Sequence, residues 1–312
     1  MLAFLFRRIG QSALVMAVMA TLVFVGVYAI GNPIDILISP EADQIEREAA
    51  IARLGLDRPL LVQFGLFVKG ALTGDLGTSF VHGVPAMDLI LSRMPATLEL
   101  ALVALVISIA LGLPLGMLAG LTPDSLLGRG IMAGSILGFS LPNFWLGLML
   151  ILAFAVEWKL FPAGGRGETR EFLGLQWSLL TADGLRHLVL PALTLAIYKA
   201  SLVARLAFAS TRETMLQDFV RFARAKGLSR TRIVGVHVLK TILIPVVTII
   251  GLEFGSMIAF AVVTETVFAW PGMGKLLIDS IYRLDRPVIV AYLMVIVVTF
   301  VFINLVVDII YS

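Results

Sequence analysis

Long runs of uncharged, mostly apolar residues dominate this 312-residue chain and leave few folds open to it. Three of these runs, 9–34, 100–123 and 131–156, contain no Asp, Glu, Lys or Arg. A helix needs about 20 apolar residues to cross the hydrocarbon core of a bilayer. Because a backbone inside lipid must satisfy its own hydrogen bonds, such runs form helices there. The sequence therefore predicts an α-helical protein that crosses a membrane several times.

Composition agrees with a membrane protein and excludes several classes of chemistry. Hydrophobic residues make up 59% of the chain and charged residues only 14%, against about 25% charged residues in soluble domains. The absence of cysteine excludes disulfides, thiolate metal sites and cysteine nucleophiles. His82, His187 and His237 are far apart and form no (i, i+4) pair, which gives a histidine metal site little support. No phosphate-binding loop, GxSxG or HExxH motif occurs, so any ATP used must be hydrolysed by another polypeptide.

The apolar runs predict one transmembrane domain over residues 1–312, with six spans and both termini in the cytoplasm. We place the spans at about 9–31, 98–122, 131–156, 188–210, 241–264 and 288–308. The inner segments hold Arg7, Arg8, Arg129 and a further nine Lys and Arg between Lys199 and Lys240, against three carboxylates. The outer segments carry fifteen acidic and twelve basic residues, a bias that agrees with the positive-inside rule. The predicted fold class is an all-α polytopic membrane protein.

The polar segments on the outer side are expected to form surface structure. Residues 35–95 are predicted to be an extracytoplasmic cap, with one surface helix over 41–56 and another that begins after Pro59 and is broken at Gly74–Gly77. Residues 265–287 are aromatic and rich in turn residues. We expect them to enter the outer membrane interface as a short helix.

Small residues and prolines inside the spans indicate how the helices pack. Gly251 and Gly255 lie one turn apart, and small residues at that interval let two helices approach closely. A proline bends a membrane helix and frees a carbonyl group. The chain has such candidate hinges, or packing features, at Pro114, Pro142 and Pro245.

Two charged residues are expected deep in the membrane. Lys199 lies about 16 Å from the outer end of its run, at a helical rise of about 1.5 Å per residue, and Glu253 is also near the middle of its span. Ionisable groups at that depth usually face a cavity or pair with each other. Lys199 and Glu253, with Ser256, are therefore candidates for lining a translocation path, where the ammonium would meet a substrate carboxylate. The alternative is a structural ion pair or a contact with a partner helix, and the sequence leaves both interpretations open.

The basic segment 212–240 is predicted to be a docking element at the cytoplasmic surface. Apolar residues recur there at helical spacing, at Met215, Phe219, Phe222 and Ala223. Gly227 is a natural left-handed stop after Lys226, and Ser229 can cap a second helix. The alternatives are a solvated loop and a surface attracted to anionic lipid. A DNA-binding helix-turn-helix is disfavoured, because both ends of the segment are tied to membrane helices.

Several phrases of the chain together resemble one family of transport proteins. ARAKGLS at Ala223–Ser229, preceded by DFVRF and followed by Ile244–Pro245, resembles the cytoplasmic signature of bacterial ABC-importer permeases. LGLDRPLLVQF, GDLGTSF, RMPATLELAL, VFAWPGMGKLLIDSI and NLVVDIIY are similar, in that order, to phrases of the first permease subunit of dipeptide, oligopeptide and nickel importers. The general signature has Glu-Ala-Ala before its glycine, where this chain has Arg221, Phe222 and Ala223. Relatives of this kind usually continue through a short polar tail beyond Ser312.

The resemblance implies the type I ABC-importer permease fold and a set of partners. It implies that an ATPase cleft receives the signature segment, through Arg221, Phe222, Ala223, Arg224, Ala225, Lys226, Gly227 and Leu228. The implied partners are a second homologous permease, two ATP-binding subunits, an extracytoplasmic substrate-binding protein that meets the outer cap, and the lipid bilayer of the bacterial inner membrane. No nucleic acid is expected. The chain itself would bind no cofactor, and ATP and Mg²⁺ would be held by the ATPase subunits.

The expected function is transport without covalent chemistry in this chain. We expect a non-catalytic permease subunit that forms the translocation path of an ATP-driven importer. Di- and oligopeptides are the expected substrates, with nickel chelates, glutathione and oligosaccharides as alternatives. A different class of function is a secondary transporter coupled to protons through Lys199 and Glu253. A third, an intramembrane enzyme, lacks any nucleophile or metal constellation in the sequence.

Overall fold

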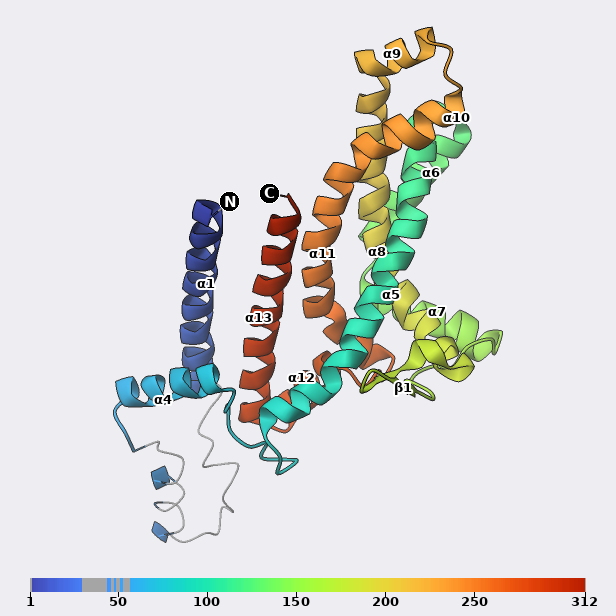
Figure 1. The fold of residues 1–312 in the computed structure, drawn as a ribbon. Coiled ribbons are helices and arrows are strands. Elements are labelled where there is room, and N and C mark those ends of the chain that lie inside the picture. The colour runs from blue at the N-terminus through green and yellow to red at the C-terminus, as the bar shows by residue number, and fades with distance from the viewer. Residues whose placement is uncertain (1, 30–43, 46–47, 49–50, 53–56, 312) are drawn as a thin grey trace.

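The computed structural model of this chain describes residues 2–29, 44–45, 48, 51–52 and 57–311, and it consists of helices and a small hairpin (Figure 1). The first helices are α1 (Leu2–Ala29), α4 (Leu60–Thr73), α5 (Ala86–Leu121), α6 (Leu126–Ser140), α7 (Asn143–Leu150) and the π-helix η1 (Ile151–Glu157). The hairpin of β1 (Arg170–Phe172) and β2 (Leu175–Trp177) is antiparallel and leads into the 3-10 turn η2 (Ser178–Leu180). The remaining helices are α8 (Ala182–Met215), α9 (Asp218–Ala225), α10 (Arg230–Arg232), the π-helix η3 (Ile233–Val238), α11 (Leu239–Val267), α12 (Met273–Tyr282) and α13 (Arg286–Tyr311). The surface helix predicted over 41–56 lies largely outside the described residues.

Four helices of the described chain are long and apolar enough to cross a membrane. They are α5, α8, α13 and the continuous helix Arg230–Val267, which contains α10, η3 and α11. A fifth candidate is α6 with α7 and η1, a pair bent by 105°. The apolar stretch found in α1 is Gly10–Gly26. The all-α polytopic class is confirmed, and the count of six spans stays a prediction.

The bend in the predicted third span arises at Pro142. Leu141 is extended, with φ −77° and ψ 130°, because a proline disfavours the helical conformation of the residue before it. Pro142 also has no N–H with which to continue α6. The run predicted as one span over 131–156 is therefore two helices. Pro114 and Pro245, in contrast, lie inside the continuous helices α5 and α11.

Helices α5 and α8 pack closely against each other at the centre of the fold. Glycines on α5 allow this close approach of the two backbones. A Cβ atom on Gly112 would lie 2.6 Å from the carbonyl oxygen of Ala200, and one on Gly116 would lie 2.2 Å from that of Ala204. Gly120 continues the same stripe against α8 one turn later. Small residues at a four-residue interval permit this close approach. Any larger side chain would force the two helices apart.

The predicted packing role of Gly251 and Gly255 is confirmed. A Cβ atom on Gly251 would lie 2.4 Å from Cγ2 of Val307, and one on Gly255 would lie 2.9 Å from the ring of Phe300. Both neighbours belong to α13, so these glycines set the contact between α11 and α13. The main buried cluster joins five helices through residues that include Leu100, Leu195, Ile258, Met273 and Ala291.

The two ends of the molecule carry different elements (Figure 1). The chain termini and α9 lie at one end, and α4, the β1–β2 hairpin and α12 lie at the other. At the first end, Arg8 Nη2 donates to Asp308 Oδ1 at 2.6 Å and ties α1 to α13. At the second, α4 crosses the end of α1, where the rings of Phe24 and Phe64 lie 5.2 Å apart. The segments expected inside and outside the cell are thus at opposite ends.

Candidate functional site

The basic segment, expected at the cytoplasmic surface, folds as a short helix, a glycine turn and the start of a second helix. α9 covers Asp218–Ala225, and Gly227 takes the left-handed conformation, with φ +75°. The N–H groups of Gly227 and Leu228 donate to carbonyl groups in the last turn of α9 at 2.9 and 3.2 Å, a pattern that ends many helices. The Ser229 hydroxyl accepts from Arg232 N at 3.4 Å and caps α10. The predicted helix, stop and cap are confirmed.

One face of α9 is built into the apolar core of this end. Val220 and Ala223 are buried in a cluster with Ile233, Val238 and Ile242. Side chains of α5 pack against the same cluster. Since interiors are closely packed, α9 is fixed both to α5 and to the helix that continues into α11.

The predicted apolar stripe of α9 is partly wrong. Phe219 and Phe222, expected on one stripe with Met215, are 38% and 62% exposed. α8 ends at Met215, before α9 begins, and the chain turns between the two helices. A helical period counted from Met215 therefore does not continue into α9. Val220 takes the buried position instead.

The opposite face of α9 is exposed and combines aromatic with basic side chains. Lys226 Nζ lies 4.6 Å from the centroid of the exposed Phe222 ring. We call this face the exposed α9 surface, and it consists of Leu216, Phe219, Arg221, Phe222, Arg224, Ala225, Lys226 and Gly227. Of the residues predicted to contact an ATPase, Ala223 is buried and Leu228 is half-buried, so neither is part of it. Large exposed apolar patches are typical of sites for another protein or a membrane, which makes this face a candidate for one.

The three candidates for a translocation path meet between α8 and α11. Lys199 Nζ contacts Glu253 Oε2, and it donates to Ser256 Oγ at 2.8 Å. Ser256 Oγ lies 2.9 Å from Glu253 Oε2, so the three side chains form one network. The side chains of Lys199 and Glu253 are 14% and 29% exposed. Of the interpretations that the sequence left open, the structure shows the ion pair between two helices. A role in lining a path stays a prediction.

Sequence reasoning missed a buried carboxylate, Glu265, near the outer end of α11. Glu265 is fully buried and accepts hydrogen bonds from Thr97 Oγ1 at 2.6 Å and from Lys275 N at 2.9 Å. A Cβ atom on Gly272 would lie 2.2 Å from Glu265 Oε1, so this carboxylate needs a glycine beside it. Glu265 thereby caps the N-terminus of α12, where the helix dipole favours a negative charge. The two glycines of WPGMGK were the sequence signal for this close approach.

A second buried carboxylate, Glu99, anchors the outer hairpin to α5. Its Oε2 accepts from Arg166 Nη2 at 2.8 Å, and its Oε1 accepts from Leu179 N at 2.9 Å. Arg166 also donates to Ser178 Oγ at 3.1 Å, and its guanidinium lies 5.7 Å from the Trp270 ring centroid. The partner of Glu99 is 67 residues along the chain, a distance at which spacing gives no signal. These bonds hold the segments on both sides of the β1–β2 hairpin against α5.

Comparisons with known proteins agree with this architecture. The family model described as "Binding-protein-dependent transport system inner membrane component" matches residues 112–312, and the model for the N-terminal part of such components matches residues 1–101. The dipeptide transport system permease protein DppB of Escherichia coli (strain K12) is 35% identical over 329 residues, covering 100% of this chain and 97% of that protein. The oligopeptide transport system permease protein AppB of Bacillus subtilis (strain 168) is 37% identical over 314 residues, covering 100% and 98%.

A solved structure has a similar fold. A chain of the MetNI methionine ABC transporter, determined in inward-facing conformations, matches with a TM-score of 0.57 at 20% identity, covering 72% of this chain and 95% of that one. At this identity the likeness concerns the fold, and it agrees with the type I importer permease fold expected from the sequence. The family models and the full-length relatives identify the family as well as the fold. This chain belongs to the family of inner membrane components of binding-protein-dependent transport systems, and it is a multi-pass ABC-importer permease.

Proposed function

We propose that this permease imports di- and oligopeptides in a complex whose other subunits hydrolyse ATP. Relatives named as dipeptide and oligopeptide transport permeases are similar to it over 100% of its length. The chain is a non-catalytic membrane subunit, as its family requires. The proposed complex adds a second permease, two ATP-binding subunits and an extracytoplasmic binding protein. ATP and Mg²⁺ would be held by the ATP-binding subunits and not by this chain.

The exposed α9 surface carries the proposal, as the contact with an ATP-binding subunit. Phe219 and Phe222 are exposed on a helix whose other face is buried. Aromatic and arginine side chains are enriched where proteins bind each other. Because Val220 packs in one cluster with Ile242 of α11, a displacement of α9 by its partner would be passed to a membrane helix. The contact residues are Arg221, Phe222, Arg224, Ala225, Lys226 and Gly227, with Leu228 at the edge and Ala223 on the transmitting face.

Lys199, Glu253 and Ser256 are proposed to line the translocation path. Their mutual contacts pair the two charges with each other. A peptide carries an ammonium and a carboxylate, so it can offer each residue another partner of opposite charge. A second permease would supply the other wall of the path.

The proton-coupled secondary transporter considered for Lys199 and Glu253 is not supported. The chain matches the binding-protein-dependent family over 1–101 and 112–312, which leaves little of it outside the match. The ion pair is retained in the proposal as part of a path and not as a proton carrier.

Transport by the reconstituted complex tests the proposal. The two permeases, the ATP-binding subunits and the binding protein are co-purified and placed in proteoliposomes with a labelled dipeptide. Uptake should require ATP and the binding protein, and it should persist when ionophores remove all ion gradients. Uptake driven by a proton gradient without ATP would contradict the proposal, as would dipeptide uptake that needs no binding protein.

A further inference from the structure

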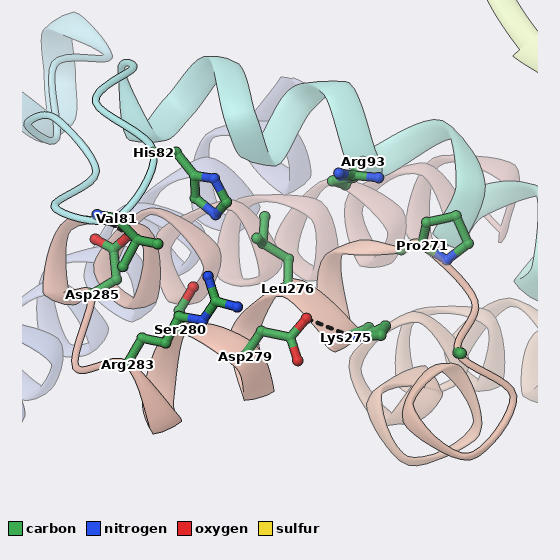
Figure 2. A pocket seen from close by; sticks show the side chains of 12 residues that line it. Val81, His82, Arg93, Pro271, Lys275, Leu276, Asp279, Ser280, Arg283 and Asp285 are labelled. Atoms are coloured by element: carbon green, nitrogen blue, oxygen red, sulfur yellow. Dashed lines mark hydrogen bonds and ion pairs between the residues drawn. The ribbon is translucent and has the colours of Figure 1, made fainter. Parts of the chain in front are cut away.

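A pocket of about 200 Å³ lies at the outer end of the molecule, between the loop before α5, the beginning of α5, and α12 (Figure 2). Its charged and titratable lining consists of His82, Arg93, Lys275, Asp279, Arg283 and Asp285. In Figure 2, His82 and Arg93 lie across the pocket from Asp279 and Arg283. The lining comes from separate elements, so the pocket is a product of the folded chain.

Both carboxylates of the pocket are already engaged. Asp279 Oδ2 pairs with Lys275 Nζ at 2.6 Å, one turn away on α12. Asp285 is fully buried, accepts from Phe80 N at 3.0 Å and is also bonded by the hydroxyl of Ser79. The charge of Asp279 is thus balanced by that of Lys275, and Asp285 is bonded by the loop before α5.

The other cationic groups of the pocket are exposed and have no acceptor among the described residues. Within the described residues, the side chains of Arg93 and Arg283 and the ring of His82 make no hydrogen bond or ion pair. Three basic side chains against two carboxylates give the pocket a net positive charge, even with the histidine neutral. A guanidinium presents its N–H donors in a planar fork that matches a carboxylate. The pocket is therefore complementary to an acidic group.

The backbone around the pocket is fixed before any ligand arrives. The bonds of Asp285 with Ser79 and Phe80 tie the loop to the turn before α13. The Ser79 hydroxyl accepts from His82 N at 2.9 Å and holds the backbone of His82. Glu265 fixes the first turn of α12 on the other side. Preorganised sites bind more tightly because less conformational entropy is lost on binding.

We propose that this pocket receives an acidic side chain of the extracytoplasmic binding protein. This inference rests on the proposed function, because it requires a binding protein as a partner. The description of the matched family names such a binding protein. The pocket lies at the end opposite the exposed α9 surface, on the side where that partner would approach. Arg93, Arg283 and the ring of His82 supply the donors for the incoming carboxylate.

The size of the pocket agrees with a single side chain better than with a whole ligand. Sites that enclose small molecules usually measure about 300–1,000 Å³, whereas this one measures about 200 Å³. Such a volume holds an aspartate or glutamate side chain and a few waters, each of about 30 Å³ in the liquid. Complementary charges of this kind raise the association rate and set the docking register.

Binding of the purified binding protein to the complete transporter in nanodiscs tests this inference, by fluorescence anisotropy at several salt concentrations. Arg93→Gln/Arg283→Gln should weaken binding about tenfold and reduce its salt dependence. Arg93→Lys/Arg283→Lys keeps both charges and should retain most of the affinity. Arg170→Gln, on the exposed strand β1 at the same end, is the matched control and should leave the affinity unchanged.

A direct contact test is available because the chain contains no cysteine. A benzophenone attached to His82→Cys in the assembled transporter should cross-link to the binding protein. Cross-links to the second permease or to lipid alone would overturn the inference, as would an unchanged affinity of the glutamine double variant. A binding protein that neither binds nor stimulates ATP hydrolysis by the unmodified transporter would contradict the proposed function instead, so the two failures are distinguishable.

Discussion

Val220 on the inner face of α9 and Ile242 of α11 are buried in the same apolar cluster. This contact joins α9 to a helix that is long and apolar enough to cross the membrane. The same short helix exposes Phe222 on its other face. α9 thus has one face packed against its own bundle and one exposed face, as the proposed coupling to an ATP-binding subunit requires.

Replacing Phe222 by aspartate should release the ATP-binding subunits. Phe222→Asp puts a charge in the middle of the exposed α9 surface, and a charge desolvated without a partner is strongly unfavourable at an interface. Co-purification of the ATP-binding subunits measures the effect, and uptake should fall about tenfold or more, as for the loss of about 1.4 kcal/mol of docking energy. Phe172→Asp changes a similarly exposed phenylalanine on the hairpin at the other end, and as the control it should leave the complex intact. Retention of the ATPase by Phe222→Asp would count against docking at α9.

Shortening Val220 should loosen the coupling without preventing docking. Val220→Ala opens space in the buried cluster and should cost about 1–3 kcal/mol of stability at this end. The ATP-binding subunits should still co-purify and hydrolyse ATP, but fewer peptides should be imported per ATP. Val247→Ala, at an exposed position of α11, serves as the comparison and should keep the normal ratio. An unchanged ratio in Val220→Ala would mean that α9 does not act through this contact.

Single and double variants of the Lys199–Glu253 pair should differ in thermal stability. Lys199→Met leaves a carboxylate without its cation inside the membrane, and breaking a buried pair costs about 3–5 kcal/mol. Lys199→Met/Glu253→Gln removes both charges and should be more stable than Lys199→Met in a thermal unfolding assay. The double variant should nevertheless fail to import peptides while the complex remains assembled. Normal import by the double variant would contradict a role of the pair in the translocation path and would mean that the contact is structural.

The capping role of Glu265 predicts an unusual sensitivity at Gly272. Gly272→Ala places a methyl group 2.2 Å from Glu265 Oε1, so the carboxylate must move away from the N-terminus of α12. Leaving a buried group without its hydrogen bonds costs about 1–3 kcal/mol, which should appear as a lower Tm of the purified permease. Gly134→Ala in α6, where an added Cβ meets nothing within 4 Å, is the control and should not lower the Tm. Equal Tm values for the two variants would contradict the capping role.

Local features were predictable from sequence because their causes are local. The turn at Gly227 and the cap at Ser229 follow from the conformational preferences of glycine and serine. The meeting of Lys199 and Glu253 was also predictable, since two opposite charges at similar depth in lipid have a strong reason to pair. The packing role of Gly251 and Gly255 was predictable from their four-residue interval in the same way.

Contacts between distant segments were not predictable. Glu99 and Arg166 are 67 residues apart, and Ser79 and Asp285 are 206 residues apart. Nothing in the spacing of such pairs indicates that the fold brings them together. The prediction of which face of α9 is buried was partly wrong for another reason. A short break after Met215 resets the helical register, so a periodic pattern read across it misplaces Phe219 and Phe222, although Ala223 is buried as predicted.

Protection of a single cysteine at position 222 tests the central claim most directly. The chain has no cysteine of its own, so Phe222→Cys can be labelled selectively with a membrane-impermeant maleimide in inside-out vesicles. Docking of an ATP-binding subunit on the exposed α9 surface predicts rapid labelling of the permease alone and slow labelling in the assembled complex. Equal labelling rates with and without the ATP-binding subunits would contradict the claim.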